Sequence, residues 1–249
     1  MANKAKRSAS RSRHSLGLQT TLMLVLAGIA TTVQANETSY SVNLAERDVQ
    51  QVTIEARFSD VDTETLNFHL PIWRSGLYLV LDFVGTMSGL VVTDEAGNPL
   101  PFEQTAKSSW SVQRPDDSTG DVVVSYRLYA DSLTDRTRHV SAEHAFLNPA
   151  AVFIYADDFR DEPIEVAIEL PEGWQAASGM EQPEPGRFIA PNYDRLVDSP
   201  IEAGTFDLVT FEAGGMTVDF LIDGIWDGDE ERLAKDIGAI VEATVGLHH

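Results

Sequence analysis

The chain of 249 residues contains no cysteine. This absence excludes disulfide bonds and thiolate metal sites, and it also excludes a lipid anchor attached through cysteine. An exported domain with this composition must therefore be stabilised by packing of its core. Apolar residues make up 43% of the sequence, and the length is enough for one or two domains of ordinary size.

Basic residues are also scarce. The chain has 18 lysines and arginines against 39 aspartates and glutamates, which gives a formal net charge of −21. Such a surface repels phosphate groups, so nucleic acid and anionic lipid surfaces are disfavoured as partners. The acidic residues are scattered along the chain, a distribution that is typical of a solvated surface.

Long apolar runs are missing as well. The longest strongly apolar stretch, residues 22–30, is short against the ~20 residues needed to cross a bilayer. It follows five basic residues and precedes Val33-Gln34-Ala35, which is typical of a signal-peptidase site. We therefore expect residues 1–35 to be a cleaved export signal and the protein to be secreted or periplasmic, with a transmembrane anchor as the alternative. Cleavage would leave 13 basic against 39 acidic residues.

From residue 39 to about residue 220, apolar and polar residues mostly alternate. This period of two predicts half-buried β-strands. Turn residues separate the strands, and no helical pattern lies between them, so residues 36–226 are predicted to form an antiparallel β-sandwich. The predicted strands are residues 52–58, 66–70, 90–93, 110–113, 122–128, 152–155, 164–170, 205–211 and 217–222.

The pattern changes near the C-terminus, where apolar residues recur at helical spacing. They predict one amphipathic helix that starts after the acidic residues 227–231, and Asp227 or Asp229 can cap it. The fold class is therefore all-β, with a single C-terminal α-helix. An apolar stripe needs a covering surface, so we expect the natural protein to continue beyond residues 227–249. The stripe consists of Leu233, Ile237, Ile240, Val241 and Val245.

Four segments, residues 70–80, 124–137, 144–155 and 193–204, together resemble the N-terminal domain of the glycyl aminopeptidase family of zinc metallopeptidases. In the first, Trp73, Gly76 and Tyr78 match a Pro-x-Trp-x-Pro-Gly-x-Tyr turn, and Ser75 stands where proline is usual. The likeness runs from about residue 40 to residue 247. It implies a sandwich that precedes a thermolysin-like catalytic domain, so residues 227–249 would be the truncated start of that domain.

The resemblance also implies a zinc site, which this chain lacks. The family binds zinc through a helical H-E-x-x-H motif, because two histidines one turn apart share a face and the glutamate activates water. No H-E-x-x-H occurs in the sequence. The nearest pattern, His139 to His144 with Glu143, is one residue longer than H-x-x-E-H, so we expect ordinary polar loop residues there. We expect no cofactor in this chain, and zinc in the missing catalytic domain.

Two acids are the candidate substrate-binding residues. Asp198 and Glu202 flank Pro200 in a segment that the resemblance places near the join with the catalytic domain. An aminopeptidase must bind the free ammonium group of its substrate, and a carboxylate there would do so. The alternative is that both carboxylates only bond backbone amides in a turn. No catalytic or metal-ligating residue is predicted.

Two functions remain open from the sequence. The leading hypothesis is an accessory domain of an exported aminopeptidase, inactive alone, whose partners are the catalytic domain of the same chain and a peptide substrate. The alternative is a stand-alone secreted module that binds glycan or peptide through an aromatic face formed by Trp73, Tyr78, Trp110 and Trp174, although core or turn packing is the favoured interpretation of these four residues.

Overall fold

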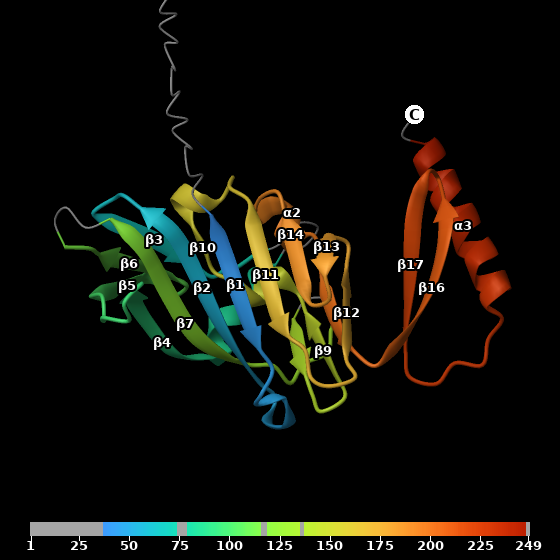
Figure 1. Ribbon diagram of the computed structural model, residues 1–249, viewed down its shortest axis with the longest axis horizontal. Helices are drawn as coiled ribbons and strands as arrows, with labels where there is room; N and C mark the ends of the chain where they lie inside the picture. Colours follow the sequence, from blue (N-terminus) through green and yellow to red (C-terminus); the bar gives the residue numbers. More distant parts are fainter. Residues whose placement is uncertain (1–36, 74–78, 116–118, 135–136, 248–249) are drawn as a thin grey trace, which may run out of the picture. The chain divides into compact units, whose positions relative to one another are not determined.

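A computed structural model describes residues 37–73, 79–115, 119–134 and 137–247 of the chain (Figure 1). The predicted export signal and the Gly76 and Tyr78 positions of the turn motif lie outside these ranges. Within the described part of the chain, no helix is long and apolar enough to cross a membrane.

The largest sheet has seven strands in the order β13-β14-β11-β1-β2-β7-β4. Its neighbours are antiparallel except for β1 and β11, which run parallel. The strands are β1 (Thr38–Asn43), β2 (Gln51–Val61), β4 (Met87–Asp94), β7 (Gly120–Tyr129), β11 (Ile164–Glu169), β13 (Glu181–Glu184) and β14 (Arg187–Ala190).

Two four-stranded antiparallel sheets complete the sandwich. Their orders are β10-β3-β6-β5 and β12-β15-β9-β8. The first consists of β3 (Thr65–His69), β5 (Phe102–Ala106), β6 (Ser109–Gln113) and β10 (Tyr155–Ala156), and the second of β8 (Arg138–Val140), β9 (His144–Leu147), β12 (Gln175–Ser178) and β15 (Ile201–Gly204).

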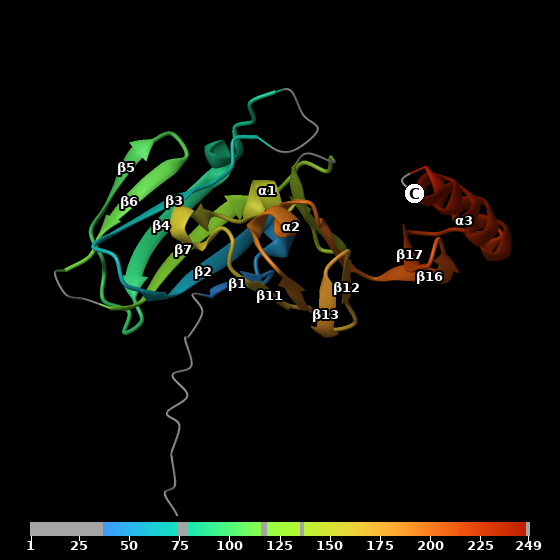
Figure 2. The same cartoon turned by 90° about the horizontal axis from the view of Figure 1, so that it is seen from above.

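One hydrophobic core joins the three sheets. Alternation explains how β2 contributes to it, because Val52, Ile54, Ala56 and Phe58 are fully buried while the residues between them are partly exposed. The short helices α1 (Pro149–Val152) and α2 (Tyr193–Val197) add side chains to the same core. They lie over the large sheet in Figure 2. Three 3-10 turns, η1 (Arg47–Val49), η2 (Phe83–Thr86) and η3 (Asp157–Phe159), complete this part. The predicted sandwich is confirmed.

One predicted strand is largely wrong. Residues 152–155 were expected to be extended, but Val152 ends α1 and only Tyr155 pairs in a strand. The Asn148 side chain caps α1 by accepting the Ala150 N–H at 3.2 Å, and Pro149 occupies the first turn, where proline is favoured. The run is buried nearly throughout, so its sequence carries no alternation that separates a helical turn from a strand.

Three buried tyrosines hold the backbone that links α1 to β10. The Tyr126 hydroxyl donates to the Val152 carbonyl at 2.8 Å, and the Tyr193 hydroxyl donates to the Phe153 carbonyl at 2.7 Å. The Tyr40 hydroxyl donates to the next carbonyl, that of Ile154. Burial raises the pKa of all three hydroxyls, so they remain protonated donors at neutral pH.

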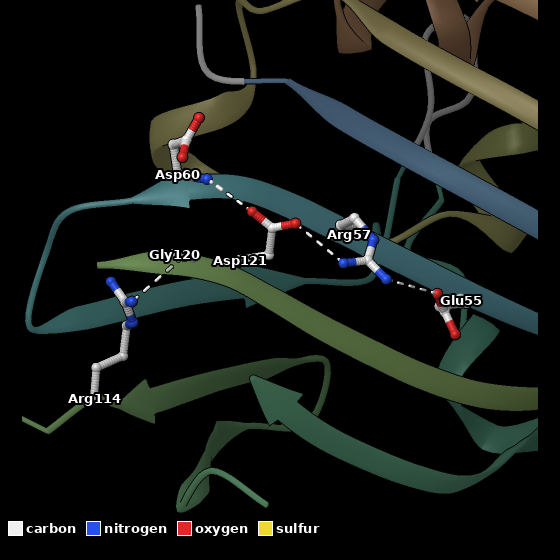
Figure 3. Close-up of polar contacts among 6 residues, drawn as sticks. All are labelled: Glu55, Arg57, Asp60, Arg114, Gly120 and Asp121. Atoms are coloured by element: carbon white, nitrogen blue, oxygen red, sulfur yellow. Dashed lines mark hydrogen bonds and ion pairs between the residues drawn. The ribbon is translucent and has the colours of Figure 1, made fainter. Parts of the chain in front are cut away.

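A polar cluster fixes the end of the β2–β7 pair, where the register shifts (Figure 3). One carboxylate oxygen of Asp121 lies 3.0 Å from Arg57 Nη1, and the other accepts the Asp60 N–H at 3.2 Å. This holds Asp60 in a left-handed conformation, with φ of 53°. Arg114, which follows β6, donates to the Gly120 carbonyl at 3.4 Å. This bond connects the end of β6 to the start of β7.

The C-terminal hairpin, β16 (Phe206–Ala213) and β17 (Met216–Asp223), forms a separate two-stranded sheet. The predicted helix is confirmed as α3 (Glu230–Gly246), and Asp229 caps it by accepting the Arg232 N–H at 3.0 Å. The helix packs on β16, where Gly238 is buried beside Phe211. Four residues of the predicted stripe are half-buried there, while Ile240 is 62% exposed because it points away from the hairpin.

The turn between β13 and β14 depends on glycine. Gly186 has φ of +76°, and a Cβ there would lie 2.8 Å from the Ile168 carbonyl oxygen. Gly173 has a similar φ of +81° but open space around it. We expect Gly173→Ala to cost about 1 kcal/mol from backbone strain alone, and Gly186→Ala to cost roughly 3 kcal/mol because the clash adds to the strain. Urea unfolding of both variants measures the difference, and equal losses would contradict it.

Candidate functional site

A hollow of about 400 Å³ lies beside α2. It is lined by residues that follow β3, by residues of and just after β10 and η3, and by residues of α2 and its C-terminal end. One wall is apolar and aromatic, and it consists of Pro71, Ile72, Trp73, Tyr155, Tyr193 and Val197. The other wall carries Arg160, Asp194 and Asp198. Three of the four segments that carry the family resemblance contribute to it, which brings together residues more than 100 positions apart in the sequence.

The aromatic wall is held by contacts from three elements. The Tyr155 ring lies 4.8 Å from the Tyr193 ring and 5.2 Å from the His69 ring on β3, measured between ring centroids. His69 is itself bonded, through Nδ1 to Ser109 at 2.8 Å and through Nε2 to Asp157 at 3.2 Å. Burial raises the pKa of Tyr155 above its ordinary value, so its hydroxyl stays neutral. The wall is therefore uncharged and fixed in place.

The cation of the hollow is already paired. Arg160 donates from Nε at 3.1 Å and from Nη2 at 2.7 Å to the same carboxylate oxygen of Asp194. Its guanidinium also lies over the Tyr155 ring, 5.5 Å from the centroid. The hydrogen bond that Arg160 donates to Asp194 raises the pKa of Arg160, so the guanidinium remains charged.

Asp198, the first of the two predicted substrate-binding residues, borders the hollow. It ends α2, where its backbone N–H donates to the Leu196 carbonyl, and its side chain is exposed. Within the described residues its carboxylate has no hydrogen-bond or ion-pair partner. The alternative that this carboxylate bonds backbone amides in a turn is therefore not observed, and among the described lining residues Asp198 carries an unpaired negative charge.

Glu202, the second predicted residue, lies elsewhere. It belongs to β15, and its carboxylate oxygen is 2.7 Å from Nδ1 of His144 on β9. Burial raises the pKa of the Glu202 carboxyl, although the hydrogen bond from His144 opposes the shift. Glu202 is not among the described residues that line the hollow, so the structure does not bring the two predicted acids into one site.

The prediction that His139 and His144 are loop residues is wrong. Both lie on strands, β8 and β9, and their ring centroids are 5.0 Å apart. Arg138, Val140, Ala145 and Leu147 alternate with them and point into the core, which places both histidines on the outer face. Within the described residues, no group of three or more histidines and acids is arranged to hold a metal ion.

Two of the four aromatic residues pack in or against the core, as the favoured interpretation expects. Trp110 is 5% exposed and stacks on Phe68 in the core. Trp174 packs against the core with Arg47 above it, and Tyr78 lies outside the described residues. Of the three aromatic residues in this set that the structure describes, Trp73 lines the hollow. Tyr155, Arg160 and Asp194 could not be found from the sequence, because the contacts of Tyr155 with Tyr193 and of Arg160 with Asp194 span 34 or more positions.

The fold is a β-sandwich module, and the volume of its hollow falls in the range that is typical of small-molecule sites. A family model, described as the Peptidase M61 N-terminal domain, matches residues 39–205. The chain therefore belongs to the M61 peptidase family, and the resemblance stated from the sequence is confirmed.

A solved structure gives the same fold. The crystal structure of an aminopeptidase N family protein from Idiomarina loihiensis is 26% identical with a TM-score of 0.76, and the match covers 84% of this chain and 36% of that protein. An M1 zinc metallopeptidase from Deinococcus radiodurans is 13% identical with a TM-score of 0.47, covering 78% of this chain and 48% of that one. The chain spans about a third of the Idiomarina protein and about half of the Deinococcus protein. No curated protein sequence matches it.

Proposed function

We propose that this chain is the N-terminal accessory domain of an exported zinc aminopeptidase, and that Asp198 binds the free ammonium group of a peptide substrate. The family match supports the peptidase context, and the basic, apolar and small-residue pattern of residues 1–35 supports export. No H-E-x-x-H occurs in the sequence, so the proposal assigns zinc to the catalytic domain of the parent enzyme. Alone, the chain should not hydrolyse peptides.

The unpaired carboxylate of Asp198 is the observation that carries the ammonium site. Arg160 is paired with Asp194, so among the described residues that line the hollow the remaining charge is that of Asp198, which attracts a cation. Hydrogen bonds between ionised partners are the strong ones, about 1.5–3 kcal/mol each. Asp198 is a better candidate than Glu202, because His144 already occupies one carboxylate oxygen of Glu202.

The Asp198→Asn substitution tests the proposal. The 249-residue chain should bind L-leucinamide, which carries a free ammonium group, and the substitution should weaken that binding roughly tenfold. N-acetyl-L-leucinamide, which lacks the charge, should bind weakly to both proteins. Isothermal titration calorimetry measures the three affinities.

Asp48→Asn is the matched control, because it removes the same charge from an exposed site in η1, away from the hollow. The affinity of this variant for L-leucinamide should differ from that of the unsubstituted chain by less than about twofold, because a distant charge is screened. Equal binding of the amine and its acetylated form, or an unchanged affinity in Asp198→Asn, would refute the role of Asp198. The reading frame beyond codon 249 tests the accessory-domain part, which requires an H-E-x-x-H motif in the same frame.

A further inference from the structure

We infer that the outer edge of β17 is a docking surface for a further β-strand, whose side chains are apolar on the side of α3 and basic on the opposite side. In the enzyme proposed above, this strand belongs to the catalytic domain of the same chain. That source of the strand rests on the proposed function, whereas neither Asp198 nor the hollow takes part in the docking surface. The two proposals can therefore fail separately.

The turn of the hairpin determines which backbone groups of β17 face outward. Gly214 and Gly215 both have positive φ, and Ala213 pairs with Met216, which is the arrangement of a two-residue type I′ turn. In such a hairpin the pair beside the turn exchanges two hydrogen bonds, and bonded and non-bonded pairs then alternate. The N–H and C=O groups of residues 217, 219, 221 and 223 therefore point away from β16. No described strand or loop outside the hairpin forms a backbone hydrogen bond with them.

The two edges of the hairpin differ in how far they are covered. On β16 the same alternation turns residues 206, 208, 210 and 212 outward, and the Gln175 side chain already donates to the Phe206 carbonyl. The helix α3 also packs mainly on β16, where Gly238 lies beside Ala213 and Phe211. Among the described elements, β17 therefore has the less covered edge.

One side of β17 supplies apolar surface for the incoming strand. Phe211 lies against α3, and its partner Val218 is on the same side because paired residues of an antiparallel ladder share a face. The core of the sandwich includes no described residue after Ala203, so the sandwich does not bury this side. A two-stranded sheet is marginal alone, and a third strand with apolar residues here would bury more of it. This side of β17 is apolar but at most half-buried, and it consists of Met216, Val218, Phe220 and Ile222.

The opposite side of β17 selects the charge of the partner. It carries Asp219 and Asp223, and within the described residues neither forms an ion pair with a lysine or arginine. The Thr210 hydroxyl donates to Asp219 at 2.6 Å, which leaves the negative charge in place. Opposite charges on neighbouring strands stabilise a sheet, and like charges destabilise it. Basic residues on the incoming strand therefore fit, whereas a second copy would bring acids together in a chain whose net charge is −21.

Two short peptides of equal length test the surface on the 249-residue chain. Both alternate valine with a charged residue, which is lysine in one and glutamate in the other. The lysine peptide should slow amide exchange at residues 217, 219 and 221 about fivefold or more, measured by NMR. By fluorescence anisotropy it should bind about tenfold more tightly than the glutamate peptide, because the cross-strand pairs with Asp219 and Asp223 change from attraction to repulsion.

Proline variants identify the edge. Leu221→Pro removes an outward N–H and should abolish the protection, since proline is tolerated where the N–H faces solvent but cannot donate to a new strand. Leu208→Pro is the matched control: it removes an outward N–H from β16 and should leave the affinity for the lysine peptide within about twofold. Asp219→Lys is a second variant, which should make the glutamate peptide the tighter ligand. Exchange at the inward amides of Val218 and Phe220 shows whether each variant keeps the hairpin.

The outcomes decide between the possible occupants. If neither peptide binds, if both bind equally, or if Leu221→Pro binds the lysine peptide as tightly as the unsubstituted chain, the docking surface is wrong. If the chain dimerises and Leu221→Pro makes it monomeric, the occupant is a second copy and the assigned partner is wrong. The affinity for L-leucinamide should be the same in Leu221→Pro and in the unsubstituted chain, so the ammonium site is tested independently.

Discussion

Arg138→Ala should cost roughly 4 kcal/mol of the free energy of unfolding. The Arg138 side chain lies inside the sandwich, and the residue is 4% exposed. Its guanidinium donates to the Phe83 carbonyl at 2.9 Å, to the Ala151 carbonyl and to the Thr86 hydroxyl, which ties β8 to α1 and η2. Alanine leaves these acceptors unsatisfied, at about 1–3 kcal/mol for each buried group, and also opens a cavity.

The charge of Arg138 explains why methionine is the informative second variant. No carboxylate pairs with Arg138 within the described residues, and burial lowers its pKa to about 10. Because this folded-state pKa is depressed, the cost of charging the group is present below pH 10 and falls only at higher pH. Arg138→Met removes that cost and fills the cavity, so it should destabilise by only about half as much as alanine.

Urea unfolding at pH 6, 7 and 8 measures both Arg138 variants against the unsubstituted chain. The losses should not change across this range, because Arg138 stays charged throughout it. A loss below about 1 kcal/mol for Arg138→Ala would show that these hydrogen bonds contribute little to stability. Losses that vary with pH would show that a different titrating group controls the effect.

The strands that the sequence predicts well are those with one buried face. In β2, alternation of buried and exposed residues follows directly from the strand geometry, so the pattern is visible without a structure. The parallel pairing of β1 with β11 is not visible, because it joins residues more than 100 positions apart and leaves no local pattern. Residues 152–155 were misassigned for the related reason that they are buried nearly throughout.

The candidate site shows the same division. Asp198 was predicted because the family resemblance singled out its segment, and the structure places it at the hollow. Nothing in the sequence indicates that Arg160 pairs with Asp194 or that His144 pairs with Glu202, since these contacts span 34 and 58 positions. A single sequence reports the polarity of a residue, whereas the partner that neutralises it depends on the tertiary fold.

Tyr126→Phe should cost about 2–3 kcal/mol of the free energy of unfolding. The Tyr126 hydroxyl makes two buried hydrogen bonds, donating to the Val152 carbonyl at 2.8 Å and accepting the Ile154 N–H at 3.2 Å. Phenylalanine keeps the ring and its packing, so the loss reports on two backbone groups left without a partner. Tyr193→Phe breaks one such bond, to the Phe153 carbonyl, and should cost about half as much.

Tyr129→Phe is the control. The Tyr129 hydroxyl donates to the Gln50 side chain at 2.9 Å, and water can reach this bond because Tyr129 is 43% exposed. Its removal should cost less than about 0.5 kcal/mol, since water replaces the lost bond.

Amide exchange adds a local measurement: in Tyr126→Phe the Ile154 amide should lose protection more than amides of β2 do. These hydrogen bonds fix the backbone that precedes Tyr155, so loosening them should also weaken leucinamide binding at the hollow. Equal stability losses for Tyr126→Phe and Tyr129→Phe would mean that the buried hydroxyls do not hold this segment.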